Sequence, residues 1–460
     1  MDSLNYKQLK NLTQEKLIDI IIKQNEIIIN LQKEIQALKK DSSNSSKPPS
    51  TDRDNTPKRK FFSRKKSGKK KGGQKGHQGK TREQLDNPDK IVFCKPDKCH
   101  NCGHDLTSLE GNIVSKRQEA DIPPIKIEVI EYQRQSIACP CCQQKNLGVY
   151  PNHLTAPMQL GLNVKSFIAY LNIKHKIPFK RLTKIFSDML NVRISEGTID
   201  KTLEQFSNKS KEIYNQLLKM VKNEQWIGSD ETGTKVNGKK WWLWVWQNVQ
   251  VSYYAISNSR GYKVVEEFFG SNYWGILVHD CWSAQNNTVA KLGHQLCHAH
   301  LLRDLEYFIE NYRDIWCYKM KQLLLSSQKA KDKIWYEYFD TDIRNRVIAD
   351  YNQQLESLIT QELSVQKEIR TLQKRFIKHQ EKILYFMDFR DVPFHNNSSE
   401  RAIRNAKIHK KISGGFRSEH GAQRHTILLS IIETCKKQNL NVLDSLKQIY
   451  SGTFSFNAGE

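Results

Sequence analysis

The alternation of hydrophobic and polar positions predicts a mixed α/β domain in the second half of the chain. Three short stretches rich in β-branched and aromatic residues follow one another at Trp226–Thr232, Trp241–Trp246 and Val251–Ile256. Ser259–Gly270 then has helical spacing, and Gly275–His279 is a short apolar run typical of a buried strand. The predicted order is therefore three strands, a helix and a fourth strand.

Two acidic residues occupy corresponding places in this order. Asp230 lies on the first predicted strand, and Asp280 directly follows the fourth. A ribonuclease-H-like fold opens with this order and places its first and fourth strands side by side, so we expect the two carboxylates to be neighbours. Two buried carboxylates cannot both stay ionised without a cation, which predicts a divalent metal. Glu231 would point to the other face of the strand, and we do not expect it to be a ligand.

A third carboxylate, Glu400, lies in a predicted helix at Asn396–Lys411. Three basic residues share its helix face at i+4, i+7 and i+11, namely Arg404, Lys407 and Lys411. A carboxylate in line with three cations suits a metal site beside a DNA phosphate backbone. The alternative is that Glu400 only completes a capping box begun by Asn397.

Together these segments resemble the transposases of the insertion sequence 66 family. The resemblance is carried by the order Asp230, Asp280, Glu400, the phrase Asn-Ser-Ser-Glu-Arg-Ala-Ile-Arg at 397–404, and the later Gly414-Gly-Phe and Gly421-Ala-Gln-Arg. It implies a DDE-type enzyme in which the three acids hold two Mg²⁺ about 3.5–4 Å apart for DNA cleavage and strand transfer. This chain has Asp280-Cys281-Trp282 where the family often has Asp-Gly-Tyr.

A heptad pattern near the N-terminus predicts a coiled-coil helix within residues 1–41. The apolar seam, with one polar break at Gln24, consists of Leu17, Ile21, Gln24, Ile28, Leu31, Ile35 and Leu38. Ile at a positions and Leu at most d positions favours a parallel two-stranded coil, hence a homodimer or a higher oligomer. The alternative is a helix packed on its own protein.

Residues 42–85 read as a disordered basic linker. From Lys58 to Lys80 there are 11 Lys or Arg residues and no Asp or Glu, with glycines between them. Such an arm gathers DNA phosphates without reading sequence. The alternative is a solvated tail with no role. The candidate DNA-binding residues are Lys65, Lys66, Lys69, Lys70 and Lys71.

Two Cys-x-x-Cys pairs in residues 86–150 predict a zinc-binding domain. Cys99 and Cys102 form the first pair, Cys139 and Cys142 the second, and 36 residues lie between the pairs. Two such knuckles on a small sheet make a tetrahedral four-cysteine site for one structural Zn²⁺. Ile125–Ile137 alternates as strands do. The alternative is four unrelated thiols.

Residues 151–215 predict a helix-turn-helix. Phe179–Leu190 reads as an amphipathic helix, a turn follows, and Ser195 caps a second helix. If the second helix reads DNA, its residues toward the major groove would be Ser195, Thr198, Lys201 and Thr202. The alternative is a plain helical hairpin leading to the catalytic domain.

The distance from Asp280 to Glu400 predicts an insertion in the catalytic domain. Those 120 residues exceed what a plain ribonuclease-H-like core needs, and residues 301–388 keep helical spacing without proline. We therefore expect a catalytic domain at 216–425, with a helical insertion at about 300–390, and a C-terminal helical region at 426–460. Cys297 and His300 have metal-ligand spacing and resemble a Cys-x-x-His motif of some inserted DDE transposases, although a packed helix start is the favoured interpretation.

Composition adds a nucleic-acid partner to this α/β multidomain prediction. The 460 residues carry a formal net charge of +24, which implies a polyanion, most simply double-stranded DNA. No apolar run is long enough for a membrane span, and no signal peptide opens the chain, so we expect a cytoplasmic protein. The family resemblance also suggests small accessory proteins. The rival interpretations are a non-catalytic DNA-binding regulator derived from a transposase, and a nuclease that hydrolyses without joining strands.

Overall fold

The computed structural model describes residues 12–39 and 83–456, except residues 124, 126, 338, 339, 364 and 365. Most of the predicted basic linker, including Lys65, Lys66, Lys69, Lys70 and Lys71, lies outside the described residues. Within the part of the chain that is described, no helix combines the length and apolarity that crossing a membrane requires.

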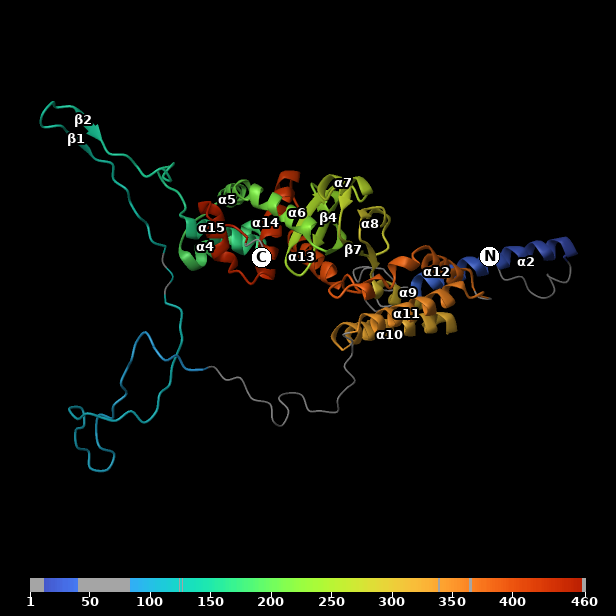
Figure 1. Cartoon of the computed structure of the whole chain (residues 1–460). Coiled ribbons are helices and arrows are strands. Elements are labelled where there is room, and N and C mark those ends of the chain that lie inside the picture. The colour runs from blue at the N-terminus through green and yellow to red at the C-terminus, as the bar shows by residue number, and fades with distance from the viewer. Residues whose placement is uncertain are drawn as a thin grey trace.

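A five-stranded mixed sheet forms the centre of the structure (Figure 1). Its strand order is β5-β4-β3-β7-β9, so the first and fourth predicted strands are neighbours. The antiparallel pairs are β3–β4 and β4–β5, whereas β7 runs parallel to both β3 and β9. The strands are β3 (Trp226–Val236), β4 (Lys239–Gln247), β5 (Ser252–Ser257), β7 (Ile276–His279) and β9 (Gly293–Leu296).

The four strands predicted from sequence are confirmed, and β9 is an addition. The β3–β4 turn has Asn237 at φ 47° and Gly238 at φ 74°, the left-handed pair that two-residue hairpins use. The indoles of Trp244 and Trp246 on β4 are buried, as expected for a core strand. Strand β9 was not predicted, because half of its residues are polar. Gln295 on this strand is nevertheless buried, and its side-chain amide donates hydrogen bonds to the carbonyls of Leu296 and Ile383.

Helices on one face of the sheet share a single hydrophobic core with it. Helix α14 lies on β5, where Ser430 Oγ accepts from Tyr254 N at 2.9 Å and Thr434 Oγ1 accepts from Ser252 N at 3.1 Å. The helices and short strands of this part are α3 (Leu162–Ala169), the π-helix η2 (Tyr170–Lys174), α4 (Phe179–Leu190), α5 (Glu196–Lys209), α6 (Lys211–Asn223), α7 (Tyr262–Phe268), β6 (Asn272–Tyr273), α8 (Ser283–Asn286), β8 (Val289–Ala290), α13 (Asn397–Ser413), α14 (Glu419–Lys437) and α15 (Val442–Ser451).

Two of the predicted domain boundaries fall inside helices. Helix α6 runs across 215/216, and α14 runs across 425/426. Buried residues of α3–α6, the sheet, α14 and α15 belong to the same core. The helix-turn-helix region and the C-terminal region therefore pack as part of one unit with the sheet.

Helices fill the range of the predicted insertion, and they have their own core on the opposite face of the sheet. The side chains of β7 divide between the two cores, with Ile276 and Val278 toward the insertion and Leu277 toward the other side. Figure 1 shows the insertion helices gathered beyond β7. They are α9 (His298–Tyr312), α10 (Ile315–Tyr336), α11 (Thr341–Thr360) and α12 (Lys367–Lys378), followed by 3₁₀ turns η3 (Gln380–Lys382) and η4 (Tyr385–Asp388).

The predicted coil segment is one helix, α2 (Gln14–Lys39), with an exposed apolar seam. Ile21, Ile28 and Ile35 are 57%, 49% and 50% exposed, and Leu31 is 51% exposed. The alternative prediction, a helix packed on its own protein, would bury this seam. The side chain of Leu38 lies outside the described residues.

The zinc-binding segment contains the two predicted knuckles but not the predicted strands. Around Cys99 and Cys139, backbone bonds from Gly103 N to Cys99 O and from Gln143 N to Cys139 O close the two turns, each at 2.9 Å. The strands expected over Ile125–Ile137 are absent from the described residues of that range, except for the start of β1 (Ser136–Ala138), which pairs with β2 (Lys145–Leu147). The apolar residues of this range alternate with polar ones, but Ile125, Val129, Ile130 and Ile137 are exposed and do not pack on a hydrophobic core.

Candidate active site

Asp230 and Asp280 lie at corresponding positions of adjacent parallel strands. Strand β3 pairs with β7 through Trp226–Ile276, Ile227–Leu277 and Gly228–Val278. Two residues further along, this register reaches Asp230 on one strand and Asp280 just beyond the other. Pairing of these two strands therefore places Asp230 beside Asp280, as predicted.

Burial and mutual repulsion disfavour ionisation of this pair. Burial raises the pKa of Asp230 well above its usual range, and the neighbouring Glu231 and Asp280 raise it further. Burial also raises the pKa of Asp280, although its Oδ1 accepts a hydrogen bond from Trp282 N at 3.1 Å. Glu400 contributes to the repulsion at both residues. Carboxylates that repel one another in this way fit a hard dication such as Mg²⁺.

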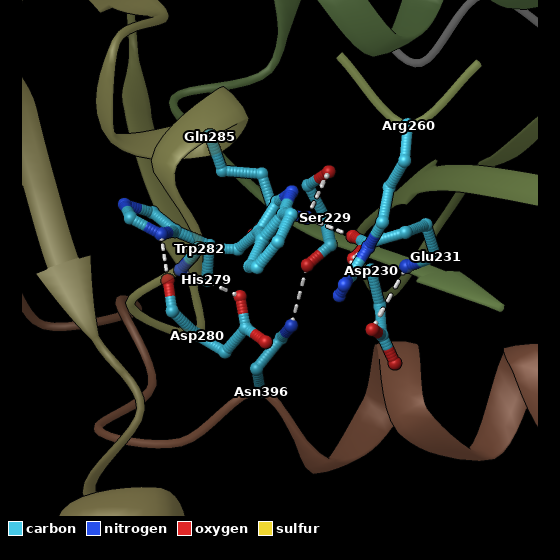
Figure 2. Close-up of polar contacts among 9 residues, drawn as sticks. All are labelled: Ser229, Asp230, Glu231, Arg260, His279, Asp280, Trp282, Gln285 and Asn396. Carbon is cyan, nitrogen blue, oxygen red and sulfur yellow. Dashed lines mark hydrogen bonds and ion pairs between the residues drawn. The ribbon is translucent and has the colours of Figure 1, made fainter. Parts of the chain in front are cut away.

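Glu231 has partners of its own on the other side of β3. Its Oε1 accepts from Arg260 Nε at 2.8 Å and Nη2 at 2.6 Å, and its Oε2 accepts from Gln285 Nε2 at 2.8 Å. Arg260 in turn stacks on Trp282, with its guanidinium carbon 3.5 Å from the ring centroid. Figure 2 shows Glu231 and Arg260 joined in this way beside Asp230. Both oxygens of Glu231 are thus engaged, in keeping with its exclusion as a ligand.

Glu400 is held at the first turn of α13, not in a capping box. The helix begins after Asn396, whose side chain forms no cap, so the alternative that Asn397 starts a capping box is wrong. Arg303 Nη2 on α9 donates to Glu400 Oε1 at 3.2 Å, and His300 Nε2 lies 3.7 Å from the same oxygen. Behind it on the same helix face, Arg404 and Lys411 are exposed and Lys407 is half-buried.

Buried polar contacts fix α13 against the sheet. Asn396 Nδ2 donates to Ser229 O at 2.6 Å, as Figure 2 shows. Gln247 Nε2 on β4 donates to both Ser398 Oγ and Ser399 Oγ at 2.9 Å. The helix approaches so closely that a Cβ on Gly228 would lie 2.4 Å from Ser399 Oγ. Sequence reasoning missed these contacts, although the polar run before Glu400 was a signal for them.

A different combination of side chains comes closest together near Glu400. Among the described residues, only Cys297, His300 and Glu400 form a group of metal-ligand types whose atoms lie within 4.8 Å of one another. The three catalytic candidates do not meet that spacing, nor do the four cysteines Cys99, Cys102, Cys139 and Cys142. The structure therefore forms each cysteine knuckle separately and leaves the two pairs apart.

The segment predicted as a helix-turn-helix contains two helices, α4 and α5, joined by a short turn. Ser195 is the N-cap of α5, as predicted, because its Oγ accepts from Thr198 N at 3.1 Å. Ser195 and Lys201 are exposed and Thr198 is half-buried. Thr202 does not face outward as expected. It is buried, and its Oγ1 donates to Thr198 O at 2.7 Å.

Residues 158–424 match the family model described as the transposase IS66 family. Residues 96–143 match the zinc-finger binding domain of transposase IS66, and residues 6–83 match a family of unknown function. The first match spans more than half of the chain and includes Asp230, Asp280 and Glu400. The second includes all four predicted zinc ligands.

Curated proteins of the bacterium Sinorhizobium fredii (strain NBRC 101917 / NGR234) are also similar. The uncharacterized protein y4hP is 22% identical over 390 residues, covering 77% of this chain and 70% of its own length. The uncharacterized protein y4qI is 24% identical over 388 residues, covering 75% and 69%.

Proposed function

Because the chain belongs to the transposase IS66 family, we propose that it is a DDE-type enzyme that cleaves and joins DNA strands at the ends of an insertion sequence. The observation that carries the proposal is that the parallel register of β3 and β7 brings Asp230, within β3, beside Asp280, just beyond β7, with Glu400 near enough to raise the pKa of both. The strand order β5-β4-β3-β7-β9 fits the ribonuclease-H-like sheet expected from the sequence and further supports the proposal.

Asp230, Asp280 and Glu400 are the residues that would hold Mg²⁺. Two such ions, when bound, supply an activated water or 3′-hydroxyl and stabilise the leaving 3′-oxygen. The protein's own part is positioning: Arg303 holds Glu400, and Asn396 anchors the start of α13 to β3. The phosphoryl transfer needs no covalent protein intermediate.

DNA binding is proposed for three surfaces. The exposed Arg404 and Lys411, with Lys407, continue from Glu400 along α13 and would contact phosphates beside the site. Ser195, Thr198 and Lys201 at the start of α5 would approach the major groove. The basic linker, with Lys65, Lys66, Lys69, Lys70 and Lys71, would add contacts independent of sequence.

One structural Zn²⁺ is proposed for Cys99, Cys102, Cys139 and Cys142. Backbone hydrogen bonds from Cys102 and Asn101 lower the pKa of Cys99, and those from Cys142 and Cys141 lower the pKa of Cys139. Amides that stabilise a thiolate are what a zinc knuckle requires, so each pair fits half of a tetrahedral site. The match to a zinc-finger domain supports joining the halves around one ion.

A strand-joining assay tests the function. Purified full-length protein would be mixed with Mg²⁺, a supercoiled plasmid and a duplex that carries the element's own end with a free 3′-hydroxyl. We expect joined product, its loss with Glu400→Gln, and retained end binding by that variant. Glu212→Gln, an exposed glutamate on α6, is the matched control and should join normally.

The rival functions predict different outcomes of the same assay. Joined product from Glu400→Gln at the level of the unsubstituted protein would contradict the proposed triad. End binding without any reaction, by the protein alone and with the element's accessory proteins added, would favour the regulator. Cleavage without joining would favour the nuclease.

A further inference from the structure

A second cluster of ligand-type side chains lies where the insertion meets the sheet and α13. Cys297 is the N-cap residue of α9 and His300 lies in its first turn, so their three-residue spacing puts both side chains on one side of the helix start. Glu400 reaches the same place from α13, one hundred residues later. The ligand atoms of all three lie within 4.8 Å of one another.

We propose that Cys297, His300 and Glu400 form a second metal site, one that takes Zn²⁺ or a similar borderline-soft dication. A thiolate, an imidazole and a carboxylate are the donors that Zn²⁺ accepts, whereas Mg²⁺ prefers oxygen alone. The sequence motif offered only two of these ligands. The fold supplies the third and thereby completes the three-ligand set of an open zinc site.

The surrounding contacts hold the ligands as a built site. Cys297 Sγ accepts a hydrogen bond from Asn396 N at 3.1 Å, and His298 N donates to Phe394 O at 2.9 Å. These bonds tie the start of α9 to the segment that leads into α13. The buried His300 Nδ1 has no hydrogen-bond partner among the described residues, and Nε2 lies 3.7 Å from Glu400 Oε1, beyond hydrogen-bond length.

The charges near the cluster balance a dication. A Cys297 thiolate and Glu400, which the proposed triad also uses, would be the two anionic ligands of the ion, and Arg303 donates to Glu400 Oε1 at 3.2 Å. Arg375 is paired with Asp304 at 2.5 Å, so these two cancel. The thiolate and the carboxylate would therefore offset the charge of a dication in this buried place.

Space for a fourth ligand lies beside the cluster. Cys297 and His300 line a cavity of about 190 Å³ together with Asp280, Trp282 and Arg375. Three protein ligands with one open position are typical of zinc sites that also hold water or substrate. A water molecule or a phosphate oxygen fits this position. The ion would thus link the helical insertion to Glu400.

Metal content of the full-length protein tests this proposal without DNA or any reaction. Protein purified with zinc and dialysed would be analysed by mass spectrometry for zinc per chain. We expect Cys297→Ser to hold one equivalent less than the unsubstituted protein. Cys435→Ser, another buried thiol on α14 away from the cluster, should keep the full count. The site predicted for Cys99 and its partners contributes equally to all variants and cancels in the difference.

A second variant keeps the test decisive if Cys297→Ser fails to fold. His300→Asn should also lose one equivalent, and Co²⁺-loaded protein should change its visible ligand-field absorption. Folded Cys297→Ser and His300→Asn proteins that retain the unsubstituted zinc count would overturn the proposal. So would loss of zinc from Cys435→Ser to the same extent. A failed joining assay leaves these results unaffected.

Discussion

The unusual feature at the scale of single residues is the concentration of acid around Asp230. Burial raises the pKa of Asp230, and burial with Asp280 raises the pKa of Glu231 to about 7 despite the Arg260 ion pair. A carboxyl whose folded pKa lies above its unfolded value stabilises the fold only while it is protonated. That contribution is present at low pH and is lost as pH rises from about 4 through the folded pKa. Bound Mg²⁺ would offset the loss, because it favours the ionised forms.

The stabilisation by Mg²⁺ should therefore increase with pH. At a Mg²⁺ concentration 100-fold above its dissociation constant, we expect a gain of about 2.7 kcal/mol, or roughly 3–5 °C in Tm, at pH 8. The gain should be much smaller at pH 5, where protons compete for the carboxylates. Differential scanning fluorimetry with and without Mg²⁺ measures it. Comparing samples with and without Mg²⁺ at the same pH cancels the contribution that buried histidines such as His279 make to the pH dependence of stability.

Asp280→Asn is the control, since it removes one carboxylate from the pair. It should abolish most of the Mg²⁺-induced shift at pH 8 and also abolish strand cleavage, while DNA binding stays. An equal Mg²⁺ shift at pH 5 and pH 8, or an undiminished shift in this variant, would contradict metal binding at these residues.

At the scale of elements, the sequence predicted the individual strands and their order but not the hydrogen bonds between residues far apart in the chain. The strand patterns of β3 and β7 and the order of elements were enough to place Asp230 beside Asp280. The bonds that seat α13 join residues far apart, Asn396 to Ser229 across 167 positions and Gln247 to Ser399 across 152. Local periodicity contains no information on such pairs. The strand prediction at Ile125–Ile137 failed for the converse reason, because alternation alone does not provide a partner surface.

The packing of α13 against β3 requires glycine at position 228, where any side chain would collide with the start of the helix. In Gly228→Ala, the new Cβ would lie 2.4 Å from Ser399 Oγ and 2.6 Å from Asn396 Oδ1, so the helix start must shift. We expect a loss of about 1–3 kcal/mol in stability, together with weaker strand joining. Urea unfolding followed by tryptophan fluorescence measures it, because Trp244 and Trp246 on β4 are buried in the adjoining core.

Gly233→Ala is the matched control on the same strand. Its nearest neighbour would be 3.9 Å away, an ordinary van der Waals contact, so its unfolding midpoint should stay close to that of the unsubstituted protein. Equal midpoints for the two variants would mean that the close approach at Gly228 does not hold α13.

At the scale of the whole molecule, the described residues divide into a packed centre and N-terminal parts outside it. The two hydrophobic cores draw their buried residues from Ile168 onward, and within the described chain neither includes α2 or the β1–β2 hairpin. The N-terminal parts therefore contribute little to folding of the centre. Their exposed apolar seam and cysteine knuckles suit contacts with other molecules, in a chain whose net charge of +24 already favours DNA.

The α2 seam should set the number of chains in the assembly. Deleting Met1–Lys40 should lower the molar mass measured by light scattering, because Ile21, Ile28 and Ile35 lose the partner seam that would bury them. A finer test compares Ile28→Lys with Ile29→Lys. Both side chains are 49% exposed in the single chain, but only Ile28 occupies an a position of the heptad. We expect Ile28→Lys to dissociate the oligomer and Ile29→Lys to leave it intact. Identical masses for all of these proteins would mean that α2 does not assemble the chains.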